Sequence, residues 1–174
     1  MVLSKQQKYL KGVIESLGCA REDQLVALLR AELCSGDPNA AEDVTEAALR
    51  RLRCCWQQLR AENGIYHMTN VRPDDRALEA VDVMIELSKA KPLCVHREKA
   101  PKLLRFSIQE QKVRRFLIAE YGASPEELQP GAHERIVLLF DAQGQAQPLS
   151  VSNKQFFAVR QEDGSHRFFA ADGQ

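Results

Sequence analysis

The stretch from Glu42 to Met68 limits the fold more than any other, because a long amphipathic pattern there runs into a turn and a short strand. With about 100° between successive residues of a helix, its apolar and polar side chains separate onto two sides. The apolar side carries Val44, Ala48, Leu52, Cys55 and Leu59. The opposite side carries Arg50, Arg53, Gln57 and Arg60. Arginine can bind guanine or phosphate and glutamine can read adenine, so the pattern is typical of a DNA-recognition helix. A solvated basic face on an ordinary core helix explains the same pattern.

The composition describes an ordinary globular protein whose basic residues must act locally. Of the 174 residues, 44% are hydrophobic and 28% are charged, which is enough apolar material for a core. The 24 lysines and arginines balance 24 acidic residues, so nucleic-acid binding would need a local basic patch. The first ten residues lack the apolar segment of a signal peptide, no apolar run could span a membrane, and the five cysteines show no regular spacing. We therefore expect a cytoplasmic protein with reduced thiols, no membrane partner and no cofactor.

Three helices are expected at the start of the chain. Amphipathic patterns predict helices over residues 4–17 and 21–33, with Ser4 as the N-cap of the first. The segment 34–39 contains glycine and proline, which interrupt a helix, and the long helix follows it.

A turn and a small β-wing are expected next. Asn63-Gly64 favours the end of the long helix, and residues 65–68 predict one strand of the wing. Its partner strand is expected over residues 69–71, where the chain offers little length before a proline. The order of helix, helix, long helix and strand predicts a winged helix-turn-helix domain over residues 1–72.

The remaining residues, 73–174, predict a second domain with one leading helix and about five strands, so the expected fold class is α+β. Residues 109–121 could instead form one continuous helix, which would replace the first hairpin. The expected elements are a helix over 76–89, a hairpin of strands 103–109 and 112–119, a strand over 134–140, and a hairpin of strands 156–160 and 166–170.

This layout resembles the replication-relaxation family and its short relatives from bacterial plasmids and conjugative elements. The features that carry the resemblance are the winged-helix pattern, the first hairpin, the apolar strand that ends in Phe140-Asp141, and the last hairpin around Asp163-Gly164. The resemblance implies that the second domain is a degenerate form of the restriction-endonuclease fold. It also implies a protein of a mobile element that acts in plasmid replication, relaxation or transfer.

Catalytic and metal sites find little support in the sequence. Glu110-Gln111-Lys112 is an acid-x-Lys triplet, but it falls at the expected hairpin turn and the preceding strand carries no acid. Cys94 and His96 are a close pair, and with His133 and His166 they could hold zinc, although no second close pair exists. We therefore expect no catalytic residue and no metal site, and a cryptic metal-dependent nuclease is the weakest alternative.

A second basic group surrounds the first hairpin of the second domain. It could contact phosphate, or it could guard a solvated sheet edge with charge. Its members are Arg97, Lys99, Lys102, Arg105, Arg114 and Arg115.

The leading hypothesis is a non-enzymatic protein that binds double-stranded DNA. Arg50, Arg53, Gln57 and Arg60 would enter the major groove. Lys5, Lys8 and, in the wing, Tyr66 would add contacts, while Tyr66 and Trp56 have core packing as the alternative role.

The second hypothesis is an adaptor that binds replication or transfer proteins through the winged helix and the β-rich domain, and a homodimer is compatible with either hypothesis. Three acidic residues at the start of the long helix favour the adaptor, because they would face phosphate unfavourably. These residues are Glu42, Asp43 and Glu46.

Overall fold

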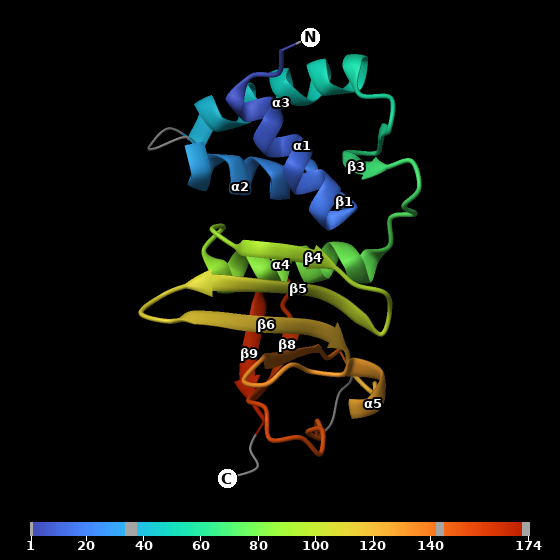
Figure 1. Cartoon of the computed structure of the whole chain (residues 1–174), viewed down its shortest axis with the longest axis vertical. Helices are drawn as coiled ribbons and strands as arrows, with labels where there is room; N and C mark the ends of the chain where they lie inside the picture. Colours follow the sequence, from blue (N-terminus) through green and yellow to red (C-terminus); the bar gives the residue numbers. More distant parts are fainter. Residues whose placement is uncertain (1, 34–37, 142–144, 172–174) are drawn as a thin grey trace.

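The chain folds into a mixed α+β structure with helices and two separate sheets (Figure 1). The computed structural model describes residues 2–33, 38–141 and 145–171. None of the described helices is both long and apolar enough to cross a membrane. The elements in chain order are α1 (Lys5–Leu17), β1 (Cys19–Arg21), α2 (Glu22–Leu33), α3 (Pro38–Cys55), β2 (Leu59–Glu62), β3 (Ile65–Met68), α4 (Asp75–Ser88), β4 (Leu93–Arg97), β5 (Lys102–Gln109), β6 (Val113–Glu120), α5 (Pro125–Leu128), β7 (Arg135–Leu139), β8 (Gln155–Arg160) and β9 (His166–Ala170).

The helices α1, α2 and α3 pack against one another and against a small antiparallel sheet of order β1-β3-β2. α1 begins as predicted, because Ser4 accepts a hydrogen bond from the Gln7 amide and Gln7 in turn accepts one from the Ser4 amide. The turn between β2 and β3 is Asn63-Gly64, whose φ angles of 51° and 74° are both positive. Such a turn matches the twist of the two strands it joins.

The predicted long helix is too long, because α3 ends at Cys55 and the chain turns before β2. The Trp56 side chain is buried in the turn, which places the following residues beside β3 rather than on α3. β2 and β3 therefore form a hairpin, and the prediction of a strand over residues 69–71 is wrong. The prediction that Cys55 faces the core is also wrong, because its side chain is exposed. The short strand β1 was not expected at all.

The second sheet has the order β4-β5-β6-β7-β8-β9. β6 and β7 are parallel, as are β7 and β8, and the other neighbours are antiparallel. The first hairpin is confirmed and the alternative of a continuous helix over 109–121 is wrong. Its turn has three residues instead of two, since Gln109 pairs with Val113. The five predicted strands are present, and β4 is a sixth that was not predicted.

Each face of this sheet has an apolar cluster. α4 packs on one face, where Phe106 and Phe116 stack with ring centroids 5.0 Å apart. The other face buries Leu117, Leu138 and Phe157, together with Leu128 of α5. The cluster under α4 is continuous with the core of the first three helices.

Polar contacts also join the helical part to α4, which lies between the three helices and the larger sheet (Figure 1). The Gln24 side chain donates to the Leu78 carbonyl over 2.8 Å and to the Asp82 carboxylate over 2.7 Å. Arg21 donates to the same carboxylate over 2.6 Å. The boundary expected at residue 72 stays a prediction, since the packing is continuous across it.

Candidate nucleic-acid interface

The exposed side of α3 carries three arginines near its end. The buried side contains small and aliphatic residues. The buried Thr45 hydroxyl donates a hydrogen bond to the Ala41 carbonyl over 2.7 Å. Arg50, Arg51 and Arg53 are exposed. Arg50 and Arg53 belong to the predicted polar face. Arg51 was missed because the face was defined by steps of three and four residues, which pass over it.

These arginines are only weakly engaged within the protein. Arg50 forms an ion pair of 2.6 Å with Glu46, whose side chain is 58% exposed while that of Arg50 is 74% exposed. An exposed pair of this kind contributes little stability, so a phosphate can compete with Glu46 for the guanidinium. Among the described residues, neither Arg51 nor Arg53 forms an ion pair.

Gln57 and Arg60 lie outside α3, which corrects the prediction of one continuous polar stripe. Gln57 is exposed in the turn and Arg60 is exposed on β2, the edge strand of the wing. The Arg60 guanidinium donates to the carbonyls of Gln57 and Leu59 over 2.8 and 3.1 Å. These bonds hold the guanidinium against the turn that follows α3, so the basic surface continues from the helix to the wing.

Tyr66 lies in the middle strand of the small sheet and is 8% exposed. Burial raises the pKa of Tyr66, the charge of Glu22 raises it further, and the nearby Arg53 opposes both. The ring therefore packs in the core, and the structure leaves it outside the exposed surface.

The lysines of α1 separate into different sites. Exposed Lys5 lies in the first turn of α1, next to Ser4 and Gln7, which share an open groove with Arg50 and Arg51. Lys8 lines a different cavity.

Lys11 is a further cation at this end of α3 that sequence reasoning missed. Its ammonium lies 4.8 Å from the centroid of the Trp56 ring and pairs with Glu15. The structure therefore gathers Lys5, Lys11 and the three arginines of α3 on neighbouring elements.

Acidic side chains occupy the first half of the same helix. Glu42, Asp43 and Glu46 are exposed, as the second hypothesis requires. α3 thus presents an acidic start and a basic end.

Part of the second basic group is paired with carboxylates, while Arg97, Lys99 and Arg115 are exposed and form no ion pair among the described residues. Arg105 pairs with Glu98 over 2.6 Å and with Glu134 over 3.0 Å, and it also donates to the carbonyls of Leu128 and Gln129. Lys102 shares Glu98 at 3.9 Å. Arg105 lies opposite Leu117, and Arg115 lies opposite Ser107, so the two arginines are not direct cross-strand partners.

The residues of the nuclease and zinc alternatives do not converge. Glu110 lies in the exposed turn after β5, and its carboxylate pairs with Arg114 over 2.8 Å. Cys94 and His96 are exposed on the edge strand β4, whereas His166 is buried on β9. Within the described ranges, no three His, Cys, Asp or Glu side chains are grouped so that they could hold a metal ion.

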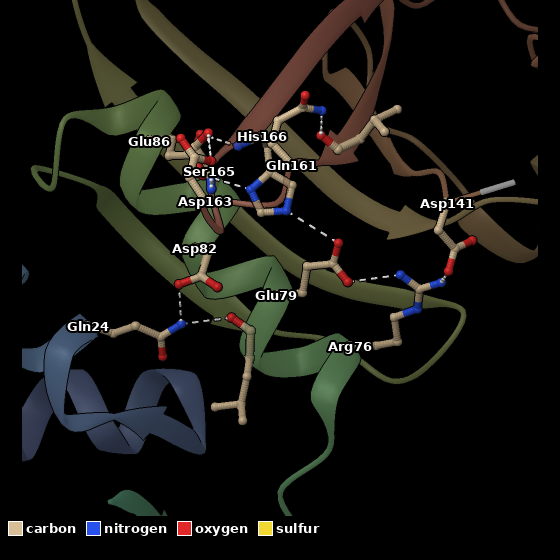
Figure 2. A network of polar contacts seen from close by, with 12 residues as sticks. Gln24, Arg76, Glu79, Asp82, Glu86, Asp141, Gln161, Asp163, Ser165 and His166 are labelled. Atoms are coloured by element: carbon tan, nitrogen blue, oxygen red, sulfur yellow. Dashed lines mark hydrogen bonds and ion pairs between the residues drawn. The ribbon is translucent and has the colours of Figure 1, made fainter. Parts of the chain in front are cut away.

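A polar network joins α4 to the last hairpin (Figure 2). The His166 ring nitrogens lie 2.7 Å from Glu86 and 3.3 Å from Glu79. Glu79 also pairs with Arg76 over 2.8 Å, and Arg76 reaches Asp141 at 2.6 Å.

The network favours the charged forms of its members. Burial alone would lower the pKa of His166, but hydrogen bonds to Glu79 and Glu86 raise it above its ordinary value. The hydrogen bond from His166 and the charge of Arg76 lower the pKa of Glu79 against the effect of burial. Because the His166 side chain has no exposed surface, this network holds the fold together and is closed to a substrate.

No family model, no curated protein and no solved structure matches this chain. Its function must therefore be inferred from the geometry of its own residues.

Proposed function

We propose that residues 1–72 form a winged helix-turn-helix domain that binds double-stranded DNA through the end of α3 and the β2–β3 wing. The observation that carries this proposal is the pair of exposed arginines Arg50 and Arg53 on one side of the end of α3, directly before a β-hairpin that carries Arg60. The order α1-β1-α2-α3-β2-β3 and the sheet order β1-β3-β2 support the winged-helix assignment.

The charge along α3 sets how the domain would meet DNA. The C-terminal end of a helix carries partial negative charge, which phosphate avoids, but three guanidinium groups there outweigh it. The acidic start of α3 must point out of the groove, while its last turns and the wing face the backbone. Lys11 of α1, which lies over the Trp56 ring, would add a phosphate contact near the end of α3, and Lys5 would add one from the first turn of α1.

For residues 73–174 we propose a non-catalytic, restriction-endonuclease-like domain. Its support is the arrangement of the sheet, in which the antiparallel strands β4, β5 and β6 are followed by α5 and the parallel strand β7. With the resemblance in layout, this favours a cytoplasmic protein of a mobile element that acts in plasmid replication, relaxation or transfer.

A second candidate function is an adaptor that binds partner proteins of replication or transfer. The observation that favours it is the exposed acidic group Glu42, Asp43 and Glu46, which lies on the surface that DNA would approach. A partner with mixed charge would complement both ends of α3.

The discriminating experiment measures fluorescence anisotropy of labelled random duplex and single-stranded DNA with the full chain, at about 50 mM and about 200 mM salt. We expect the duplex to bind, and the double variant Arg50→Ala, Arg53→Ala to weaken that binding on every sequence. The slope of log affinity against log salt should fall by about two units in the double variant.

The matched control is Arg114→Ala, Arg115→Ala, which removes two exposed arginines from β6. It should leave duplex binding unchanged. Equal binding by the α3 variant would remove the proposed surface, and absence of duplex binding by the unmodified chain would favour the adaptor.

A further inference from the structure

A cavity of about 350 Å³ lies where the helical part of the chain meets α4 and β4. It is distinct from the groove beside Arg50 and Arg51. Its walls are mainly apolar and come from four elements, so both parts of the molecule contribute to it. Of its apolar lining residues, Val13 of α1 and Val95 of β4 are partly exposed, whereas Leu28 of α2 and Met84 of α4 are buried.

The space within the cavity depends on Gly12. Glycine in the interior of a helix makes the helix less stable than alanine would, so its presence needs a reason. A Cβ atom added at Gly12 would meet no atom within 4 Å, so the fold itself does not require a glycine there. Lys8, Gly12 and Ser16 follow one another at intervals of four residues on α1, so Gly12 leaves a gap between an ammonium and a hydroxyl group.

The polar groups of the cavity suit an acidic head group. Exposed Lys8 has no ion-pair partner anywhere in the described parts of the chain. The Tyr9 hydroxyl donates to the Leu28 carbonyl over 3.3 Å. Burial, with a contribution from the charge of Glu32, raises the pKa of Tyr9 to about 12, so the phenol stays neutral. Glu32 does not line the cavity, which leaves Lys8 as the cation at its rim.

We propose that this cavity binds a small amphipathic monocarboxylate. Its flat apolar body would fill the gap at Gly12 and contact Val13, close to the buried Met84, and its carboxylate would pair with the Lys8 ammonium. The volume lies within the range of about 300–1,000 Å³ that is usual for small-molecule sites, at the lower end. The proposal is independent of DNA binding and can be tested without DNA.

The test uses 1-naphthoate as the probe and methyl carbons of methionine as the readout. The chain has three methionines, and Met84 lines the cavity while Met68 lies on β3 outside it. In the full chain labelled with ¹³C-methyl methionine, we expect the Met84 signal to shift saturably with 1-naphthoate and the Met68 signal to stay. A Met84 signal that does not move up to about 5 mM probe, where only very weak binding would escape detection, overturns the proposal.

A neutral probe separates the apolar contact from the charge contact. 1-Naphthalenemethanol should bind about tenfold more weakly than 1-naphthoate, because it cannot pair with Lys8. The variant Lys8→Gln should abolish that preference, and the matched variant Lys5→Gln, on the same helix but outside the cavity, should retain it. Equal binding of both probes by the unmodified chain would contradict the assignment of an acidic ligand.

The variant Gly12→Leu fills the gap and should weaken 1-naphthoate binding at least about tenfold. Circular dichroism is used to check whether this variant is folded. Full affinity in a folded Gly12→Leu protein would overturn the site. If Gly12→Leu does not fold, the Lys8→Gln and Lys5→Gln pair decides the question.

Discussion

Arg50 at the end of α3 and Arg105 on the larger sheet have opposite surroundings, although the residue type is the same. Arg50 is 74% exposed and holds a single exposed partner, whereas Arg105 is 27% exposed and contacts two carboxylates and two carbonyls. Since the chain has equal numbers of acidic and basic residues, carboxylates that neutralise one region leave another region free. The difference teaches that a protein with no net charge can still present a basic surface, provided its acidic side chains pair with cations in another region.

The largest effect should follow from removing the Arg105 guanidinium. Arg105→Met keeps the aliphatic part of the side chain but leaves the buried Glu134 carboxylate without its cation. We expect the free energy of unfolding to fall by about 3 kcal/mol in urea titrations, because breaking such a pair strands a buried charge. The control Arg115→Met, at an exposed site on β6, should change stability by less than about 0.5 kcal/mol. Similar losses of unfolding free energy in both variants would contradict the distinction between internally paired and free arginines.

Removing the His166 ring should have the next largest effect, and it should depend on pH. The folded state raises the pKa of His166 above its ordinary value of 6.5, so the folded state binds its proton more tightly. Its contribution is therefore complete below pH 6.5 and is lost as the pH rises through the raised pKa. Glu79, whose pKa is lowered, contributes above its ordinary value and loses its contribution in acid.

We therefore expect His166→Gln to lose about 2 kcal/mol of stability near pH 6. The loss should shrink as the pH rises, since the unmodified protein loses the imidazolium as well. Urea midpoints across this pH range measure it, with Gln161→Ala at an exposed site beside the same hairpin as the control. A loss that is constant with pH would mean that the charge of His166 does not contribute.

A smaller effect should come from the contact between the helical part and α4. Gln24→Leu removes the donor to both the Leu78 carbonyl and the Asp82 carboxylate, and it should lower stability by about 1 kcal/mol. Thermal unfolding measures this, with exposed Gln58→Leu as the matched control. If the two variants have the same melting temperature, the polar contact contributes no stability beyond that of the shared apolar core.

The smallest effect on stability should come from Arg50→Ala. Its exposed pair with Glu46 contributes at most about 0.5 kcal/mol, so the urea midpoint should hardly move. A loss as large as that of Arg105→Met would show that Arg50 is a structural residue and not a free one.

Much of the fold follows from local patterns in the sequence. The first four helices and the hairpin at Asp163-Gly164 were predicted because capping residues, glycine and periodicity mark them locally, whereas Asn63-Gly64, which was expected to end the long helix, joins β2 to β3. The end of α3 was missed because no glycine or proline stands at residues 56–58, and the turn there depends on burial of Trp56. β1 has only three residues and depends on pairing with β3, which is a tertiary contact.

The candidate site was predictable in part. Arg50 and Arg53 were predicted on an exposed helix face, and both are exposed on α3. No local signal could show that Lys8 lines a cavity, that Tyr66 is buried, or that Lys11 lies over Trp56. Each depends on how α1 and the small sheet pack against α3, since neighbours in space are not neighbours in the sequence.

The most direct test maps the contact of duplex DNA on the ¹⁵N-labelled protein by amide chemical shifts. The amides of Arg50, Arg51 and Arg53 and of the β2–β3 wing should shift with added duplex, while those around Arg105 and Glu134 should stay. Shifts confined to the larger sheet, or no shifts at saturating DNA, would contradict the proposal that duplex DNA binds at the end of α3.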